Sequence, residues 1–219
     1  MNQILQAVQI LKQGGIVAYP TDTAYGLAVD ATNAAAVKKL YRLKGRDFNN
    51  PIHVIVPLGH HHTVVYDGEE ARKLVKQFWP GPLTIVLSLK AKGQSWKMLS
   101  AGTGTLGIRY PDNSTAQALV EALKKPITTT SANISGQPNT YSVAQIKKQF
   151  AKSKLKPDFY LDGGKLKNTK LSTVVMINPT PDPSPRKGRG VLSRRKSSGR
   201  VTILRSGPVT EKQIKAILK

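Results

Sequence analysis

Three short polar stretches carry side chains that could bind an anionic ligand. The first is Tyr19–Leu27 (YPTDTAYGL), which gathers hydroxyl groups and one carboxylate directly after a short apolar run. Ligands of open α/β sheets bind at the edge where the strands end, so this position favours a binding site. The same residues could instead form a polar turn, closed by hydrogen bonds from the side chains of Thr21 and Asp22.

The second stretch is Leu43–Asp47 (LKGRD), in which Lys44 and Arg46 flank a glycine at an expected helix end. A guanidinium offers a bidentate fork and an ammonium a compact charge, and together they suit the phosphates of a nucleotide. The alternative is structural, because basic side chains often offset the negative end of a helix macrodipole.

The third stretch is Thr128–Gly136 (TTTSANISG), a hydroxyl-rich segment that leads into Ser131 and Asn133. Short donors and acceptors of this kind could hold a phosphate or the edge of a base. A polar turn after a buried strand explains the same composition equally well.

Several other chemistries lack the residues they need. The chain has no cysteine, which excludes disulfides, thiolate catalysis and Cys-ligated metals. The twelve acids are scattered, and no Walker A, G-x-S-x-G or G-x-G-x-x-G motif occurs. His60–His62 are three adjacent histidines without a zinc-site spacing, so we predict no metal site. His53 is expected to point to the face of its strand opposite Ile52 and Val54.

The composition is typical of a globular protein with a strong basic bias. The 219 residues are 39% hydrophobic and carry a net charge of +22. Residues 180–200 hold seven basic residues and one acid, which leaves +16 on the rest of the chain. This charge indicates contact with nucleic acid or phosphates, although a solvated basic surface is the alternative. Without a signal-peptide pattern or a membrane-spanning apolar run, the protein is expected to be soluble and cytoplasmic.

Helical and strand patterns alternate along the chain, which predicts an α/β domain with a mixed sheet. The predicted helices, read from caps and apolar spacing, are 2–13, 33–45, 69–79, 114–124, 142–150 and 210–218. The predicted strands are 16–19, 52–56, 83–89, 105–109, 127–130, 159–161, 172–177 and 201–204. We expect one domain over residues 1–219. Residues 179–199, rich in proline and then in basic residues, are expected to be a mobile insertion in the last hairpin.

Six motifs occur in the order seen in the YrdC/YciO family, and the chain resembles that family from about Leu5 to Leu218. The motifs are PTDTAYGL, K-G-R, FWPGPLT, GIRYP, TTSANISG and the pair STVV…VTILRSG. The resemblance implies a single YrdC-like domain, a twisted open mixed sheet flanked by helices, with a large basic cavity. It also implies synthesis of threonylcarbamoyl-AMP and pyrophosphate from L-threonine, bicarbonate and ATP, a nucleotidyltransferase reaction that serves threonylcarbamoyladenosine modification of tRNA.

The resemblance also implies roles for individual side chains. Catalysis is assigned to Lys44 and Arg46. The residues expected to bind the nucleotide are Lys44, Arg46, Ser131, Asn133, Ser172 and Arg205. The residues expected to bind threonine are Thr21, Thr23, Tyr25, His53 and Arg109. ATP is expected to bring Mg²⁺ on its phosphates, and the protein itself is predicted to have no metal site.

The partners implied are the three substrates, a downstream threonylcarbamoyl transferase complex and, through the basic surface, tRNA or another RNA; no membrane is expected. Two alternatives stay open at this point. One is a YciO-type paralogue without synthase activity, and the other is a non-catalytic RNA-binding or ribosome-associated protein.

Overall fold

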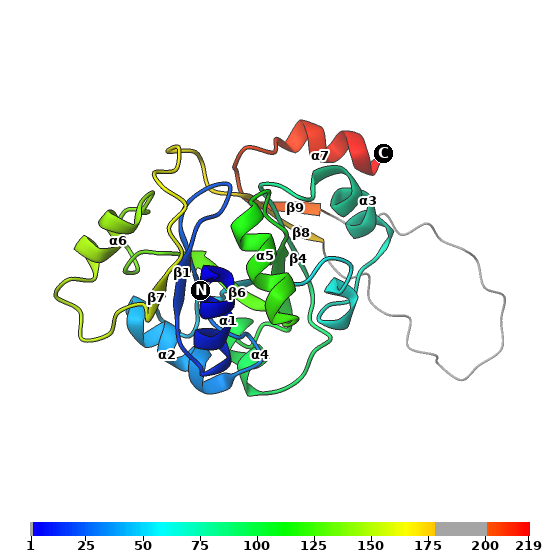
Figure 1. The fold of residues 1–219 in the computed structure, drawn as a ribbon. Helices are drawn as coiled ribbons and strands as arrows, with labels where there is room; N and C mark the ends of the chain where they lie inside the picture. The colour runs from blue at the N-terminus through cyan, green and yellow to red at the C-terminus, as the bar shows by residue number, and fades with distance from the viewer. Residues whose placement is uncertain (1, 178–200) are drawn as a thin grey trace.

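A computed structural model describes residues 2–177 and 201–219. Its strands form one sheet in the order β7-β1-β2-β6-β3-β5-β4-β8-β9, with parallel and antiparallel neighbours and helices on both faces (Figure 1). The predicted α/β class and open mixed sheet are therefore confirmed. The predicted insertion at residues 179–199 lies outside the described residues.

The element bounds follow the predicted pattern closely. The strands are β1 (Val17–Tyr19), β2 (Gly26–Ala28), β3 (His53–Ile55), β4 (Leu83–Ser88), β5 (Thr105–Arg109), β6 (Ile127–Ser131), β7 (Phe159–Tyr160), β8 (Thr173–Ile177) and β9 (Val201–Arg205). The helices are α1 (Gln3–Lys12), α2 (Ala34–Lys44), the 3₁₀ turn η1 (His61–Thr63), α3 (Glu69–Phe78), α4 (Gln94–Leu99), α5 (Ser114–Leu123), α6 (Val143–Gln149) and α7 (Glu211–Leu218).

Side-chain caps explain where several helices begin. Asn2, Asn33, Asn113, Ser142 and Thr210 each accept a hydrogen bond from a free backbone N–H in the first turn of α1, α2, α5, α6 and α7. At the other end of α2, the glycine of the K-G-R motif adopts φ 57° and ψ 34°, a left-handed conformation that ends the helix. The polar residue types at these positions thus fix the helix boundaries.

Three elements were not predicted: β2, α4 and η1. Strand β2 begins at the end of the polar stretch YPTDTAYGL and is only three residues long, so its alternation is too short to recognise. Helix α4 is a six-residue helix without a side-chain N-cap. Short elements such as these owe their existence to tertiary packing, which sequence periodicity does not show.

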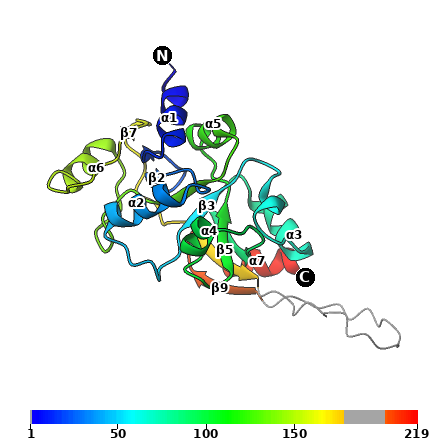
Figure 2. The same cartoon turned by 90° about the horizontal axis from the view of Figure 1, so that it is seen from below.

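The two faces of the sheet are covered by different helices. Within the described residues, one face packs against α2, α3, α4, α6 and α7, and the other packs against α1 and α5. Helices α1 and α5 lie side by side (Figures 1 and 2). Two helices are too few to cover nine strands, so part of this second face is left without a helix.

The last hairpin keeps its pairing across the intervening residues 178–200. Strands β8 and β9 are antiparallel, with a register shift between Val174 and Val175, and β8 also pairs with β4 in parallel.

No helix among residues 2–177 and 201–219 has both the length and the apolar character needed to cross a membrane.

Substitutions on α1 test how much the second face contributes to stability. Leu11 is fully buried against this face, whereas Leu5, on the same helix, is 57% exposed. We expect Leu11→Ala to lower the free energy of unfolding by about 2–5 kcal/mol, because it removes buried methyl groups and leaves a cavity. The matched Leu5→Ala should cost less than about 1 kcal/mol. Urea denaturation measures both, and equal losses would contradict this packing.

Candidate active site

The part of the second sheet face without a helix holds a cavity of about 250 Å³. The strands change character along their length at its border. On β3, Ile55 packs under α1 and α5 while His53, two residues before it, lines the cavity. On β6, Ile127 is apolar and Thr129 and Ser131 line the cavity. Alternate residues of a strand share a face, so this two-residue step is what places polar groups beside the apolar core.

The cavity wall combines hydroxyl groups with three arginines. It is lined by Thr21, Thr23, Ala24, Tyr25, Gly26, Arg46, Pro51, Ile52, His53, Thr84, Arg109, Thr129, Thr130, Ser131, Leu171, Ser172 and Arg205. No carboxylate lines it within the described residues. The arrangement therefore favours anions, because the basic side chains face the cavity without a neutralising partner on its wall.

Arg109, at the end of β5, is 5% exposed, and its guanidinium is held in place by hydrogen-bond partners. It forms an ion pair with Asp22 and donates a hydrogen bond from Nη1 to Thr23 Oγ1 at 3.2 Å. Burial raises the pKa of Asp22, and the neighbouring Arg109 opposes that rise. Asp22 does not line the cavity, so its carboxylate fixes the direction of the guanidinium rather than contacting a ligand.

The ring of His53 packs closely against Gly107, the glycine of the GIRYP motif. A Cβ atom built on Gly107 would stand 2.4 Å from His53 Cδ2 and 2.9 Å from Cγ. Burial lowers the pKa of His53 to about 4, and the charges of Arg205, Arg46 and Arg109 lower it further. The imidazole is therefore neutral at pH 7, and the positive charge of the cavity comes from its arginines.

The loop after β1 is closed by its own hydroxyl groups. Thr21 Oγ1 donates to Ala24 O at 2.7 Å and accepts from Thr23 N at 3.2 Å. Tyr25 OH donates to Gly164 O at 2.8 Å and accepts from Gly163 N at 2.9 Å. The turn and the ligand-site interpretations of this stretch are thus compatible, because the turn presents its residues to the cavity.

Lys44 is 1% exposed and lies behind the cavity wall. Its ammonium donates to Ser131 O at 2.5 Å, Asn133 O at 2.7 Å and Asn133 Oδ1 at 3.1 Å. Burial lowers the pKa of Lys44 to about 7, and the charge of Arg46 acts in the same direction. Lys44 thus ties the end of α2 to the loop that follows β6.

The left-handed Gly45 sends Arg46 away from Lys44 and into the cavity wall. Arg46 Nη2 donates to Pro51 O at 2.9 Å, and Nε donates to Asn50 O at 3.2 Å. The two basic residues of the K-G-R motif therefore do different work. One holds a loop, and the other presents its guanidinium to the cavity.

Another part of the cavity wall comes from the last hairpin. Arg205 donates to Ser172 O and to Ser172 Oγ, both at 3.0 Å. Ser172 Oγ also lies 2.9 Å from Thr84 Oγ1 on β4. Arg205 and Ser172 are adjacent in space even though residues 178–200 separate their strands in sequence.

Of the eleven predicted site residues, nine line one cavity: Thr21, Thr23, Tyr25, Arg46, His53, Arg109, Ser131, Ser172 and Arg205. Lys44 and Asn133 lie behind its wall. The roles assigned to these side chains stay predictions. The residues that sequence analysis did not assign are Asp22, Thr84, Gly107, Thr129 and Thr130. Thr84 had a visible signal, a polar residue within an otherwise apolar strand, and Asp22 was the one carboxylate of its motif.

The three adjacent histidines lie on and beside η1, away from this cavity. His61 Nε2 is 3.6 Å from Asp67 Oδ2. Within the described part of the chain, no three His, Cys, Asp or Glu side chains gather as metal ligands would.

A double-mutant cycle tests the packing of His53 on Gly107. We expect Gly107→Ala to lower the free energy of unfolding by about 1–3 kcal/mol, because the new methyl group collides with the imidazole. In a His53→Ala background the same change should cost about 0.5 kcal/mol or less, because the collision is gone. Urea denaturation of the four proteins gives the coupling. Equal costs in both backgrounds would contradict the contact.

The pH dependence of stability tests the burial of His53. Its folded pKa of about 4 lies below the unfolded value of about 6.5, so between these pH values only the unfolded chain binds the proton. Stability is therefore lost as the pH falls from 6.5 to 4. We expect the wild-type protein to lose about 2–3 kcal/mol more than His53→Gln over this range. Parallel curves for the two proteins in urea denaturation would refute a buried neutral imidazole.

A family model and individual relatives of known name indicate the same family for this chain. The Sua5/YciO/YrdC family model, described as telomere recombination, matches residues 9–188. Threonylcarbamoyl-AMP synthase of Bacillus subtilis is 34% identical over 220 residues, covering 99% of this chain and 56% of the relative.

Two solved structures share the fold. Pyrococcus abyssi Sua5 complexed with L-threonine superposes with a TM-score of 0.80 at 30% identity, covering 98% of this chain and 56% of that one. Escherichia coli YciO superposes with a TM-score of 0.75 at 28% identity, covering 96% and 92%. The chain thus spans a little over half the length of the first two relatives and nearly the whole of the third. It belongs to the Sua5/YciO/YrdC family.

Proposed function

We propose that this protein is a threonylcarbamoyl-AMP synthase, an enzyme that transfers the AMP group of ATP. The observation that carries the proposal is the approach of Arg46, Arg109 and Arg205 to one strand-borne cavity whose wall holds hydroxyl groups and no carboxylate among the described residues. All three substrates of such a synthase carry carboxylate, bicarbonate or phosphate groups. The name of the Bacillus subtilis relative and the L-threonine bound in Pyrococcus abyssi Sua5 support the same activity.

The chemistry requires two bond-forming steps. The threonine amine attacks bicarbonate, which gives a carbamate and releases water. A carbamate oxygen then attacks the α-phosphorus of ATP, the bond to the β-phosphate breaks, and pyrophosphate leaves. Both steps join anions, so the protein contributes mainly by holding them together and stabilising the negative charge on the phosphates.

The geometry suggests how this chain divides the work. Arg46 and Arg205, which both line the cavity, bind the phosphates, and Ser131 and Ser172 contact the nucleotide. Arg109, oriented by Asp22, binds the α-carboxylate of threonine. A guanidinium fixed in this way suits a planar carboxylate, because its donors are already directed.

Four further predicted residues complete the threonine subsite: Thr21, Thr23, Tyr25 and His53. The neutral imidazole of His53 can exchange hydrogen bonds with threonine without adding charge. Lys44 acts in this proposal by positioning the Ser131–Asn133 loop. Direct contact of Lys44 with a phosphate stays a prediction, since its ammonium already donates to three oxygens.

The remaining partners follow from the substrates. Mg²⁺ enters with ATP as part of the substrate. The product is a reactive mixed anhydride, and a downstream threonylcarbamoyl transferase complex transfers its threonylcarbamoyl group to tRNA, with AMP as the leaving group. We therefore propose that this protein acts in the cytoplasm, where the transferase complex and tRNA reside.

Pyrophosphate release tests the proposal directly. We expect release to require ATP, L-threonine and bicarbonate together, with each omitted in turn as a control. Arg46→Gln should lower kcat/KM for ATP at least about tenfold, which corresponds to about 1.4 kcal/mol of transition-state stabilisation. The matched Arg42→Gln, on the exposed side of α2, should leave the rate unchanged.

The other outcomes separate the alternatives. A folded protein that binds ATP without turnover would overturn the synthase and favour a YciO-type paralogue, which the near-complete coverage of the Escherichia coli YciO chain makes a specific rival. Failure to bind ATP at all would leave a non-catalytic RNA-binding protein.

A further inference from the structure

Two hydroxyl groups and a guanidinium link β4 to the last hairpin at the cavity wall. Thr84 Oγ1, on β4, lies 2.9 Å from Oγ of Ser172, the residue before β8. Arg205 Nη2, at the end of β9, donates to the same Ser172 oxygen at 3.0 Å. All three side chains line the cavity. Ser172 and Arg205 have predicted roles in nucleotide binding, whereas Thr84 has none.

Arg205 depends on Ser172 for its position. It is exposed on β9, the last strand of the sheet, and within the described residues no carboxylate forms an ion pair with it. Its guanidinium is held by Ser172 O and Ser172 Oγ, both at 3.0 Å. A long, exposed side chain loses rotamer freedom when it is fixed, so these two bonds decide where the guanidinium lies. Because both acceptors are neutral, its positive charge stays available to an anion.

The backbone around Ser172 is fixed by its neighbours. Thr173 N donates to Pro82 O at 2.9 Å, and Thr173 Oγ1 donates to Val209 O at 2.7 Å. Gly207 passes so close that a Cβ atom built on it would stand 2.7 Å from the carbonyl carbon of Ser172. The direction of the Ser172 hydroxyl is therefore what remains to be set.

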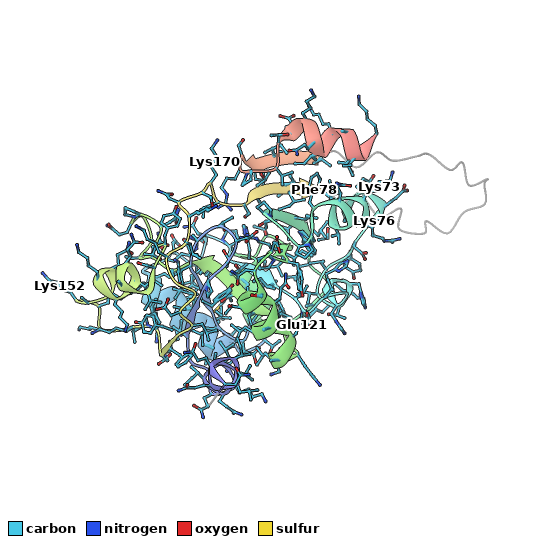
Figure 3. The ribbon with its side chains drawn as sticks, turned by 45° about the horizontal axis from the view of Figure 1, so that its top comes forward. Lys73, Lys76, Phe78, Glu121, Lys152 and Lys170 are labelled. Carbon is cyan, nitrogen blue, oxygen red and sulfur yellow. The ribbon has the colours of Figure 1, made fainter. Side chains whose placement is uncertain are left out.

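Burial of both hydroxyl groups indicates which one donates. Figure 3 shows Lys170 on the outside of the molecule, where the chain approaches β8. Two residues later, Ser172 is 3% exposed, and Thr84 is 1% exposed. Buried hydroxyl groups need hydrogen-bond partners, and among the described residues Thr84 Oγ1 has Ser172 Oγ as its partner. Donation from Thr84 to Ser172 satisfies the more deeply buried of the two groups.

This direction leaves the proton of Ser172 for a ligand. A hydroxyl oxygen accepts two hydrogen bonds and donates one. Arg205 and Thr84 occupy both acceptor positions of Ser172 Oγ, so its proton points away from them and into the cavity that Ser172 lines. Phosphate oxygens accept hydrogen bonds, and a donor that is oriented in advance needs no reorganisation when such an oxygen arrives.

We propose that Thr84 is a positioning residue of the nucleotide subsite. It directs the hydroxyl proton of Ser172 towards a phosphate of ATP and keeps Ser172 Oγ as an acceptor for Arg205. The inference rests on the proposed function for the identity of the ligand. It adds a residue that acts through Ser172 rather than by touching the substrate.

Nucleotide affinity and kinetics of matched variants test this role. The variants are Thr84→Val, which keeps the shape of the side chain but lacks the hydroxyl, Thr84→Ser, Ser172→Ala and the double variant Thr84→Val/Ser172→Ala. The control is Thr105→Val, at the other end of the β4–β5 ladder, which removes a hydroxyl that lies 3.0 Å from Thr103 Oγ1. Calorimetry gives the Kd for ATP without L-threonine. Pyrophosphate release gives the KM values for ATP and for L-threonine.

We expect Thr84→Val to raise the Kd and the KM for ATP about threefold to tenfold, the size of effect that one oriented hydrogen bond has. Thr84→Ser should restore both to within about twofold of wild type, because it restores the donor. In the Ser172→Ala background, Thr84→Val should change the Kd less than about twofold, since no hydroxyl is left to orient. The control Thr105→Val should match the wild type.

Thr84→Val should remain folded, because valine is favoured in strands, and urea denaturation checks this. Thr84→Ala, which also lacks the hydroxyl, is the second variant and should raise the Kd for ATP in the same way.

Several results would overturn the positioning role. One is an unchanged Kd for ATP in Thr84→Val and Thr84→Ala. Another is a full effect of Thr84→Val in the Ser172→Ala background, which would show that Thr84 contacts the ligand itself. Thr84 lies opposite Arg109 in the β4–β5 pairing, so an equal rise in the KM for L-threonine would assign it to the threonine subsite instead.

The calorimetric measurement separates this inference from the proposed function. A wild-type protein that binds ATP without releasing pyrophosphate would contradict the synthase, while the Kd values would still decide the role of Thr84. Turnover by the wild type with no effect of Thr84→Val would refute the positioning role alone. Failure of the wild type to bind ATP would overturn both.

Discussion

The ammonium of Lys44 is the contact on which the geometry of the site depends. It is almost completely buried, and a buried charge is costly unless hydrogen-bond acceptors surround it. Here two carbonyl groups and one side-chain amide oxygen of the Ser131–Asn133 loop surround it. The loop at the end of β6 is thereby fixed to the end of α2, and the left-handed Gly45 that follows turns Arg46 towards the cavity. The buried amino group of Lys44 thus links the end of α2 to the residues that follow β6.

The rest of the site follows from incomplete coverage of one sheet face. Helices α1 and α5 bury the apolar part of that face, and the uncovered part carries His53, Thr84, Arg109, Thr129 and Ser131 on rigid strands. Side chains on paired strands lose little freedom when a ligand binds, which favours precise positioning of charged substrates. Asp22 directs Arg109 from behind, and Gly107 leaves room for the ring of His53. The cavity is therefore shaped by side chains that do not line it as well as by those that do.

Much of this arrangement was predictable from the sequence, because caps and alternation are local signals. Asn33 and Gly45 predicted both ends of α2, and the alternation around His53 predicted the face to which it points. Lys44 was different. Its sequence context gives no sign that the ammonium turns towards residues almost ninety positions later, because that contact depends on where the fold places the end of α2. The ion pair of Asp22 with Arg109 and the space above Gly107 are long-range features of the same kind. The order of the motifs predicted which residues belong to the site. Only the fold shows which of them line the cavity and which hold the lining residues in place.

A crystal structure with L-threonine and a non-hydrolysable ATP analogue would test the central claim most directly. The account predicts the threonine carboxylate within hydrogen-bond distance of Arg109, beside His53, and the phosphates between Arg46 and Arg205. Binding of either ligand elsewhere, such as the groove between β9 and α7 lined by Val201, Ile203 and Ile214, would contradict it.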